Sequence, residues 1–160
     1  MRHVRAIALA ALGLLLLVPA SAYADATLFL GATTSPSNRL TKGAAIGGGL
    51  LILGFEFEYA DTTNDVATQA PSLKTGMGNL LIQSPVAFVG IQPYFTVGGG
   101  GYREELGTVS NTGVAGNTGG GLKINLVGPV RLRVDYRVLM LRSALVSPAH
   151  RFYAGINLKF

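Results

Sequence analysis

Few residues in this chain could carry out acid–base or nucleophilic chemistry. The 160 residues include no cysteine and two histidines, and His3 falls in an N-terminal segment that we expect to be removed. His150 is therefore the single candidate base, and Ser143 and Ser147 lie a few positions before it. A nucleophile needs a base within hydrogen-bond reach, but a lone histidine at the start of a strand is more often an interface or loop residue. We predict no catalytic residues.

Metal and phosphate sites are not indicated either. No cluster of His, Asp and Glu has the spacing of metal ligands. The glycine runs 47–49, 98–101 and 119–121 could suggest a phosphate-binding loop, but no helical pattern follows them and no Lys-Ser/Thr pair completes a P-loop. Glycine within strands more often allows bending and close approach of a neighbouring backbone, and that is our interpretation. We predict no metal and no cofactor.

The most regularly spaced charges lie in two segments. Within the segment 130–140 a charged residue stands at every second position from 131 to 137, and within residues 51–60 two glutamates are spaced in the same way. Because a strand projects alternate side chains to opposite faces, the charges of each segment share one face. They would meet if the two segments faced each other inside a closed barrel. We therefore predict an interior ion-pair network made of Glu56, Glu58, Arg131, Arg133, Asp135 and Arg137.

Eight segments have the pattern of β-strands. Apolar residues recur at alternate positions in most of them, and clusters of Gly, Pro, Asn and Ser mark turns between them. Pro93 falls inside the fifth segment, where proline cannot donate a ladder hydrogen bond, so we expect a bulge there. The polar stretches 61–74 and 104–113 are expected to be long connections. The eight segments are 26–33, 42–49, 51–60, 75–83, 89–102, 115–126, 130–140 and 150–160.

The N-terminus reads as a secretory signal peptide that covers residues 1–24. Arg2 and Arg5 form its positive region, an apolar run follows, and Ala22-Tyr23-Ala24 is an A-x-A cleavage site. The apolar run is shorter than the roughly 20 residues that a spanning helix needs. We therefore expect a mature chain that begins at Asp25, with residues 25–160 forming one domain. Its charges are scattered along the sequence, so we do not expect a nucleic-acid partner.

The composition favours strands that lie in a membrane. Only 13% of the residues are charged, against about a quarter in soluble domains. A soluble lipocalin-like barrel also has eight strands, but its small interior would have to hold the aromatic residues of three strands. The sequence therefore predicts an all-β fold, an eight-stranded antiparallel transmembrane β-barrel with up-and-down meander topology. The aromatic residues in question are Phe55, Phe57, Tyr59, Tyr136, Phe152 and Phe160.

The pieces GFEFEYAD (54–61), GIQPYFTVGGGGYR (90–103) and GGGLKINLVGPVRLRVDYR (119–137) resemble the small OmpA/OmpX-type outer membrane protein β-barrel domain family. The C-terminal segment 153–160 is similar to the assembly signal of outer-membrane barrels, in which a glycine, an apolar residue and a final aromatic share one strand. The chain departs from the family in having no Trp for its aromatic girdles. The resemblance assigns the assembly signal to Tyr153, Gly155, Leu158 and Phe160.

The resemblance implies a place and a set of partners. The place is the bacterial outer membrane, and the partners are its lipid, its lipopolysaccharide and the barrel-assembly machinery, with the barrel itself a monomer. An eight-stranded lumen is usually filled by side chains, so we expect a polar, side-chain-filled core. We predict a non-enzymatic protein with a structural or surface-interaction role through its outer loops. Two alternatives stay open. One is a narrow porin-like channel, and the other is a lipid A-modifying enzyme, because small barrels of that kind use His and Ser on the outer rim.

Overall fold

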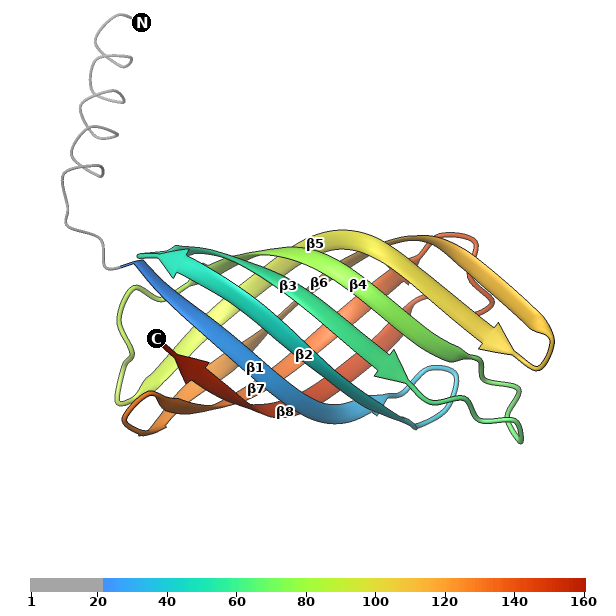
Figure 1. The fold of residues 1–160 in the computed structure, drawn as a ribbon, viewed down its shortest axis with the longest axis horizontal. Coiled ribbons are helices and arrows are strands. Elements are labelled where there is room, and N and C mark those ends of the chain that lie inside the picture. Colours follow the sequence, from blue (N-terminus) through green and yellow to red (C-terminus); the bar gives the residue numbers. More distant parts are fainter. Residues whose placement is uncertain (1–21) are drawn as a thin grey trace, which may run out of the picture.

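A computed structural model of the chain describes residues 22–160 as a barrel of eight antiparallel strands (Figure 1). Each strand pairs with the next, and β8 pairs with β1 to close the sheet. The predicted fold class is therefore confirmed. No helix among these residues is long and apolar enough to cross a membrane. The strands are β1 (Ala22–Thr33), β2 (Arg39–Leu50), β3 (Leu53–Thr62), β4 (Ser72–Gln83), β5 (Ile91–Leu106), β6 (Val109–Val127), β7 (Val130–Leu141) and β8 (Ala149–Lys159).

The connections at the two ends of the barrel differ. The end that carries the start of β1 and the C-terminus, which we call the turn end, has two-residue connections at 51–52 and 128–129 and a longer one at 84–90 (Figure 1). The opposite loop end has connections at 34–38, 63–71 and 142–148 and the β5–β6 hairpin. Bacterial outer-membrane barrels have short turns on the periplasmic side and longer loops outside. The loop end therefore corresponds to the outer side.

The side chains alternate between the two faces of the sheet as the sequence predicts. Along β3 and β8 the apolar residues face outward and the polar ones are buried inside. Phe57, for example, is 65% exposed on the outer surface, whereas its neighbours Glu56 and Glu58 are buried. This inverse pattern, apolar outside and polar inside, is that of a transmembrane barrel.

The stretch 104–113 was expected to be a polar connection, and this prediction is wrong. β5 continues to Leu106 and β6 begins at Val109, so only Gly107 and Thr108 connect them. Gly107 has a positive φ of 59°, as two-residue hairpin turns require. The hairpin extends past the other strands in Figure 1. The outer part of the hairpin lies beyond the apolar band. The polar residues there therefore indicate where that band ends, not where the strands end.

The bulge expected at Pro93 is also absent. Pro93 pairs in regular register with Leu122 of β6, and the only register shift between β6 and β7 lies at Asn125/Val127. The carbonyl of Pro93 accepts from the backbone N–H of Ser84 at 3.0 Å. The proline nitrogen points to the same side, where β4 has already ended at Gln83. The missing N–H therefore falls where the β4–β5 ladder has ended, and proline fits without a bulge.

The first strand begins earlier than the predicted cleavage site. Residues 1–21 lie outside the described part, but Ala22, Tyr23 and Ala24 belong to β1. The backbone of Ala24 exchanges two hydrogen bonds with Phe160, at 2.8 and 2.9 Å. Tyr23 accepts a hydrogen bond from Gln83, and the ammonium group of Lys159 lies 4.9 Å from its ring centroid. Cleavage before Asp25 would remove these contacts, including the hydrogen bonds of Ala24 at the closing seam, where β1 pairs with β8.

In place of Asp25, we now expect the mature protein to begin at Tyr23. Ala20-Ser21-Ala22 is a second A-x-A sequence, and cleavage after it keeps the contacts of Tyr23 and Ala24. The intact mass of protein isolated from the membrane checks this. A mass that starts at Asp25 would contradict the expectation, and a mass that includes residues 1–22 would exclude cleavage at either site.

Candidate functional site

The barrel interior holds a network of buried charges, and its centre is the carboxylate of Glu56. Both terminal nitrogens of Arg133 contact this carboxylate, one of them at 3.2 Å from Oε1. Arg137 Nη2 donates to the same Oε1 at 2.9 Å. Glu56 comes from β3 and the arginines from β7, which are four strands apart in a barrel of eight. The pairs therefore cross the lumen, and both arginine side chains are fully buried.

Asp135 lies between the two arginines on the same strand. Its carboxylate is 3.1 Å from Arg133 Nη2 and 3.0 Å from Arg137 Nε. Tyr94 of β5 donates its hydroxyl hydrogen to Asp135 and accepts a hydrogen bond from Arg133 Nε at 2.7 Å. The tyrosine thus joins a third strand to the pair.

Glu58 anchors a second layer nearer the loop end. Arg137 Nη1 lies 3.0 Å from its Oε2, and Arg151 Nη1 lies 3.2 Å from its Oε1. The hydroxyl of Tyr153 also donates to Glu58, at 3.2 Å. Arg151 was missed as a network member, although the alternation in β8 places it on the same face as Tyr153. With no charged partner near it in the sequence, that position carried no sign of pairing.

Arg131 is the exception among the predicted network residues. It lies near the turn end, where its Nη2 is 3.0 Å from Asp25 of β1. Lys123 of β6 contacts the same Asp25 oxygen at 2.6 Å, and Arg131 Nε donates to Asn157 at 2.7 Å. Arg131 is too near the turn end to reach Glu56 or Glu58. A separate layer around Asp25 therefore replaces the expected pairing.

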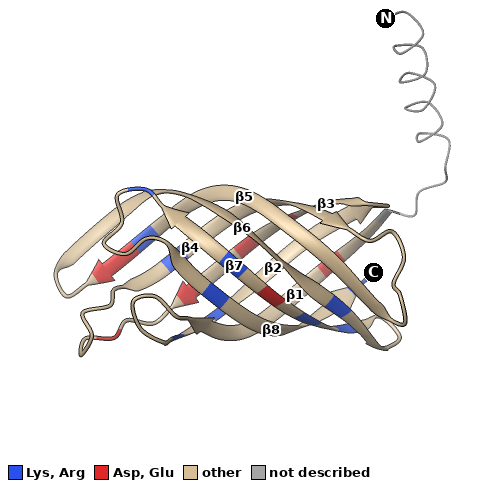
Figure 2. Cartoon of the chain, turned by 180° about the vertical axis from the view of Figure 1, so that it is seen from behind, with Lys and Arg blue, Asp and Glu red and all other residues tan. Residues whose placement is uncertain are grey.

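The interior is not polar throughout, contrary to our expectation. Along β7 toward the loop end, the inward positions after Arg137 are Leu139 and Leu141, both buried. They belong to a cluster of inward apolar side chains in the loop-end half of the lumen. The inward series on β7 thus changes from charged to apolar partway along the strand. The cluster consists of Leu73, Met77, Tyr102, Ala115, Leu139, Leu141 and Ala149. Figure 2 shows the charged positions on the ribbon, with a red position between blue ones on β7.

The four residues of the predicted assembly signal lie on both faces of β8. Tyr153 is buried inside and stacks on Phe29 of β1, with ring centroids 4.0 Å apart. Gly155 is also inward, and a Cβ there would approach the carbonyl oxygen of Leu28 to 2.4 Å, so the close β1–β8 pairing needs glycine. Leu158 and Phe160 face outward and are exposed. Two of the four residues therefore face the interior and two face the outer surface.

His150 has no serine partner in the structure. Its Nδ1 is 2.8 Å from the hydroxyl of Tyr136. The Ser147 hydroxyl accepts from the backbone N–H of Leu141 at 3.1 Å, and Ser143 offers its backbone carbonyl to Asn111. Within residues 22–160 no group of three or more His, Cys, Asp or Glu side chains is arranged to hold a metal ion.

Comparison with known proteins identifies the fold. No protein-family model and no curated protein matches the sequence. The N-terminal β-barrel domain of Pseudomonas aeruginosa OprF is 13% identical with a TM-score of 0.66, over 86% of this chain and 97% of that one. Neisserial surface protein A (NspA) is 16% identical with a TM-score of 0.66, over 87% and 96%.

A third similar structure is Yersinia pestis Ail in a phospholipid bilayer nanodisc. It is 13% identical with a TM-score of 0.53, over 85% of this chain and 99% of that one. At these identities the likeness concerns the fold. This chain has the eight-stranded barrel fold of small bacterial outer-membrane proteins, in agreement with the OmpA/OmpX-type resemblance of its sequence.

Proposed function

We propose that this chain is a non-enzymatic barrel of the bacterial outer membrane whose lumen is closed by side chains and which acts through its outer loops. The observation that carries the proposal is the set of ion pairs from Glu56 to Arg133 and Arg137, which crosses the lumen at its centre. An eight-stranded barrel has an interior just wide enough for side chains to fill. Side chains that meet across it leave no width for a solute.

The apolar cluster adds a second barrier. It lies in the loop-end half of the lumen, where the wall of β1–β3 carries the buried, mutually hydrogen-bonded hydroxyls of Thr33, Thr41 and Thr62. Side chains therefore fill this half as well, so a change that opens the central ion pairs leaves it closed. This supports a structural barrel over a narrow porin-like channel.

The outer loops are held together by hydrogen bonds. The hydroxyl of Thr68 in loop 63–71 donates to Asp65 at 2.7 Å, and Ser37 of loop 34–38 donates to the same oxygen at 3.3 Å. These hydrogen bonds, that from Thr68 first, hold the pKa of Asp65 below its usual value. Arg39 donates to the carbonyls of Ser35 and Pro71. A preorganised loop surface loses less entropy when it binds a partner, which supports a surface-interaction role.

The enzyme alternative lacks the contact that it needs. Nucleophilic hydrolysis requires a serine within hydrogen-bond reach of the base, whereas the recorded partner of His150 is Tyr136. Ser147 is engaged by the backbone of Leu141. The proposal therefore assigns His150 a structural role at the loop-end rim. Mass spectra of lipid A from cells that produce the protein should show no modification.

Purified protein in planar lipid bilayers should show no stable conductance steps, because side chains fill the lumen both at its centre and in its loop-end half. A variant with Arg133→Ala and Leu139→Ala, which removes one side chain from each barrier, should conduct measurably more than either single variant. Regular conductance steps from the unchanged protein would overturn the closed-lumen proposal in favour of a channel.

Glu56→Ala should destabilise the barrel by about 3–5 kcal/mol, because it leaves buried arginine charges short of a partner. Adding Arg133→Ala should recover part of this loss. Denaturant unfolding in lipid vesicles, followed by heat-modifiable gel migration because the chain has no Trp, measures both.

The matched control for Glu56 is Glu105→Ala, which removes an exposed carboxylate paired with Arg103 at 2.7 Å. Exposed pairs contribute at most about 1 kcal/mol, so this variant should unfold almost like the unchanged protein. Equal effects of Glu56→Ala and Glu105→Ala, or strict additivity of Glu56→Ala with Arg133→Ala, would mean that the lumen is hydrated.

Deletion of Phe160 should impair assembly more than it weakens the finished barrel, because the resemblance makes this terminal aromatic part of the assembly signal. Unassembled, protease-sensitive chain should accumulate in the periplasm of cells, whereas the same chain refolded in vesicles should still show the folded gel migration. Normal surface yield of the deleted chain would disprove the role.

A further inference from the structure

Charged side chains on the outer surface of β2–β5 are concentrated near the loop end. Four of them are cross-strand partners in one continuous row: Lys42 pairs with Asp61, Asp61 with Lys74, and Lys74 with Arg103. We call these four residues the loop-end row. Toward the turn end, the outward positions of the same strands are apolar or glycine, among them Ile46, Phe57, Leu80 and Val97. The row therefore borders the apolar band on its outer side.

The two lysines of the row form no ion pair within residues 22–160. Arg103 does pair with Glu105, at 2.7 Å. Asp61 lies between them in register, half-buried and itself without a recorded ion pair. Strands two apart are separated by roughly 10 Å, and lysine stems extend along apolar surface to place their ammonium groups at the interface. Both ammonium groups can therefore reach one anion.

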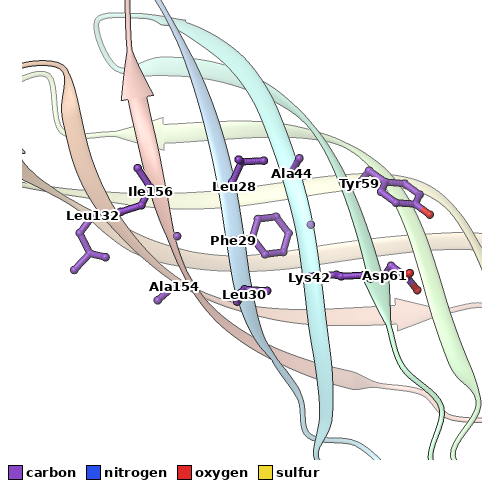
Figure 3. Close-up of a pocket in the computed structure, with 12 residues that line it drawn as sticks. Leu28, Phe29, Leu30, Lys42, Ala44, Tyr59, Asp61, Leu132, Ala154 and Ile156 are labelled. Atoms are coloured by element: carbon purple, nitrogen blue, oxygen red, sulfur yellow. The ribbon is translucent and has the colours of Figure 1, made fainter.

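An apolar groove leads away from Lys42 across the closing seam. It is shallow, with a volume of about 690 Å³, and Lys42, Tyr59 and Asp61 line one side of it (Figure 3). Its hollows follow from the register. Ala44 lies between the larger residues Tyr59 and Leu28. Ala154 is the partner of Leu30 on the next strand. The small residues leave space on an otherwise bulky surface, and the groove ends near Ile156 and Leu132.

A cationic end and an apolar groove together match an amphiphile with an anionic head. Lysine binds phosphate as a point charge, and the apolar walls fit a hydrocarbon chain. The loop end corresponds to the outer side of the membrane, so the amphiphile comes from the outer leaflet. Away from Lys42 and Asp61 the face around the groove is outward and apolar, which suits lipid more than water.

We infer that the loop-end row and the groove form a binding site for a phosphorylated glycolipid of the lipid A type, with a phosphate on Lys42 and Lys74 and an acyl chain over Ala44 and Ala154. The inference rests on the proposed outer-membrane function for the orientation of the barrel. It does not require the lumen to be closed. Asp61 sets a limit on the site, because its carboxylate lies in register between the two lysines and reduces the net positive charge that attracts a phosphate.

The test is native mass spectrometry of the full mature barrel, titrated with bis-phosphorylated lipid A. The Lys42→Gln/Lys74→Gln variant should bind roughly tenfold or more weakly than the unchanged protein, since each basic residue near a membrane surface contributes appreciably to anionic lipid binding. The control variant Arg142→Gln/Lys159→Gln removes two exposed charges outside the row and should bind like the unchanged protein.

Two further arms test the groove and the source of the phosphate. Ala44→Phe fills the groove and should weaken binding, whereas Val114→Phe, on the outward face of β6, should not. Lipid A without its phosphates should bind more weakly than intact lipid A. Phosphatidylglycerol should also bind more weakly than intact lipid A.

Equal binding by the lysine variant and its control would overturn the site, and so would a dimer that forms through this face in place of lipid binding. Equal binding of phosphatidylglycerol would overturn the assignment to lipid A. These results are independent of bilayer conductance. A barrel that conducts, and whose lipid A binding still depends on Lys42 and Lys74, would refute the closed lumen and support the lipid site. A barrel that does not conduct, and whose lipid A binding does not depend on these lysines, would support the closed lumen and refute the lipid site.

Discussion

The structure depends on one constraint, which is that the charges turned away from lipid must find partners inside a narrow lumen. Transferring charges from water is costly, and an incomplete buried network is worse than an apolar core. The barrel satisfies this by giving every central carboxylate two cations: Glu56 contacts Arg133 and Arg137, and Asp135 contacts the same two. These contacts join β3 to β7 across the interior. They therefore favour one strand register, because a one-residue slip would turn the charges toward lipid.

The closing seam between β1 and β8 has to be close for this network to form. Tyr153 donates to Glu58, and its ring packs flat on Phe29, which faces inward while its strand neighbours Leu28 and Leu30 face outward. Space for Phe29 comes from Gly43, where a Cβ would approach the ring to 2.3 Å. Glycine in the wall thus allows aromatic residues in the interior. The groove on the outer surface has a different cause, because it lies over the small outward residues Ala44 and Ala154.

The sequence predicts well what strand periodicity controls and poorly what tertiary position controls. The alternation in β3, β7 and β8 correctly indicates which side chains face inward, and with eight strands it also places Glu56 opposite Arg133. It does not reveal that Asp25, beside the predicted cleavage site, pairs with Lys123 and Arg131, because those contacts depend on the heights of three strands. The outer part of the β5–β6 hairpin was predicted to be a loop, because a polar strand beyond the apolar band has the composition of a loop. Leu139 and Leu141 continue the spacing of the inward arginines of β7. Because they are apolar, the sequence alone favours an outward, lipid-facing position for them.

The arrangement of interior chemistry along the barrel axis explains how one strand can serve two environments. On β7 the inward residues run from Arg131 near the turn end, through the central ion pairs, to Leu139 and Leu141 near the loop end. On the outer surface of β2–β5 the order is reversed, with apolar residues toward the turn end and lysines at the loop end. Charged and apolar side chains thus follow opposite orders along the axis on these strands, while the loop-end interior also holds the buried charges of Arg39 and Glu104. A buried apolar cluster needs no partners, so the lumen can be filled at the loop end without using the lysines outside, and their charges stay available to the membrane surface.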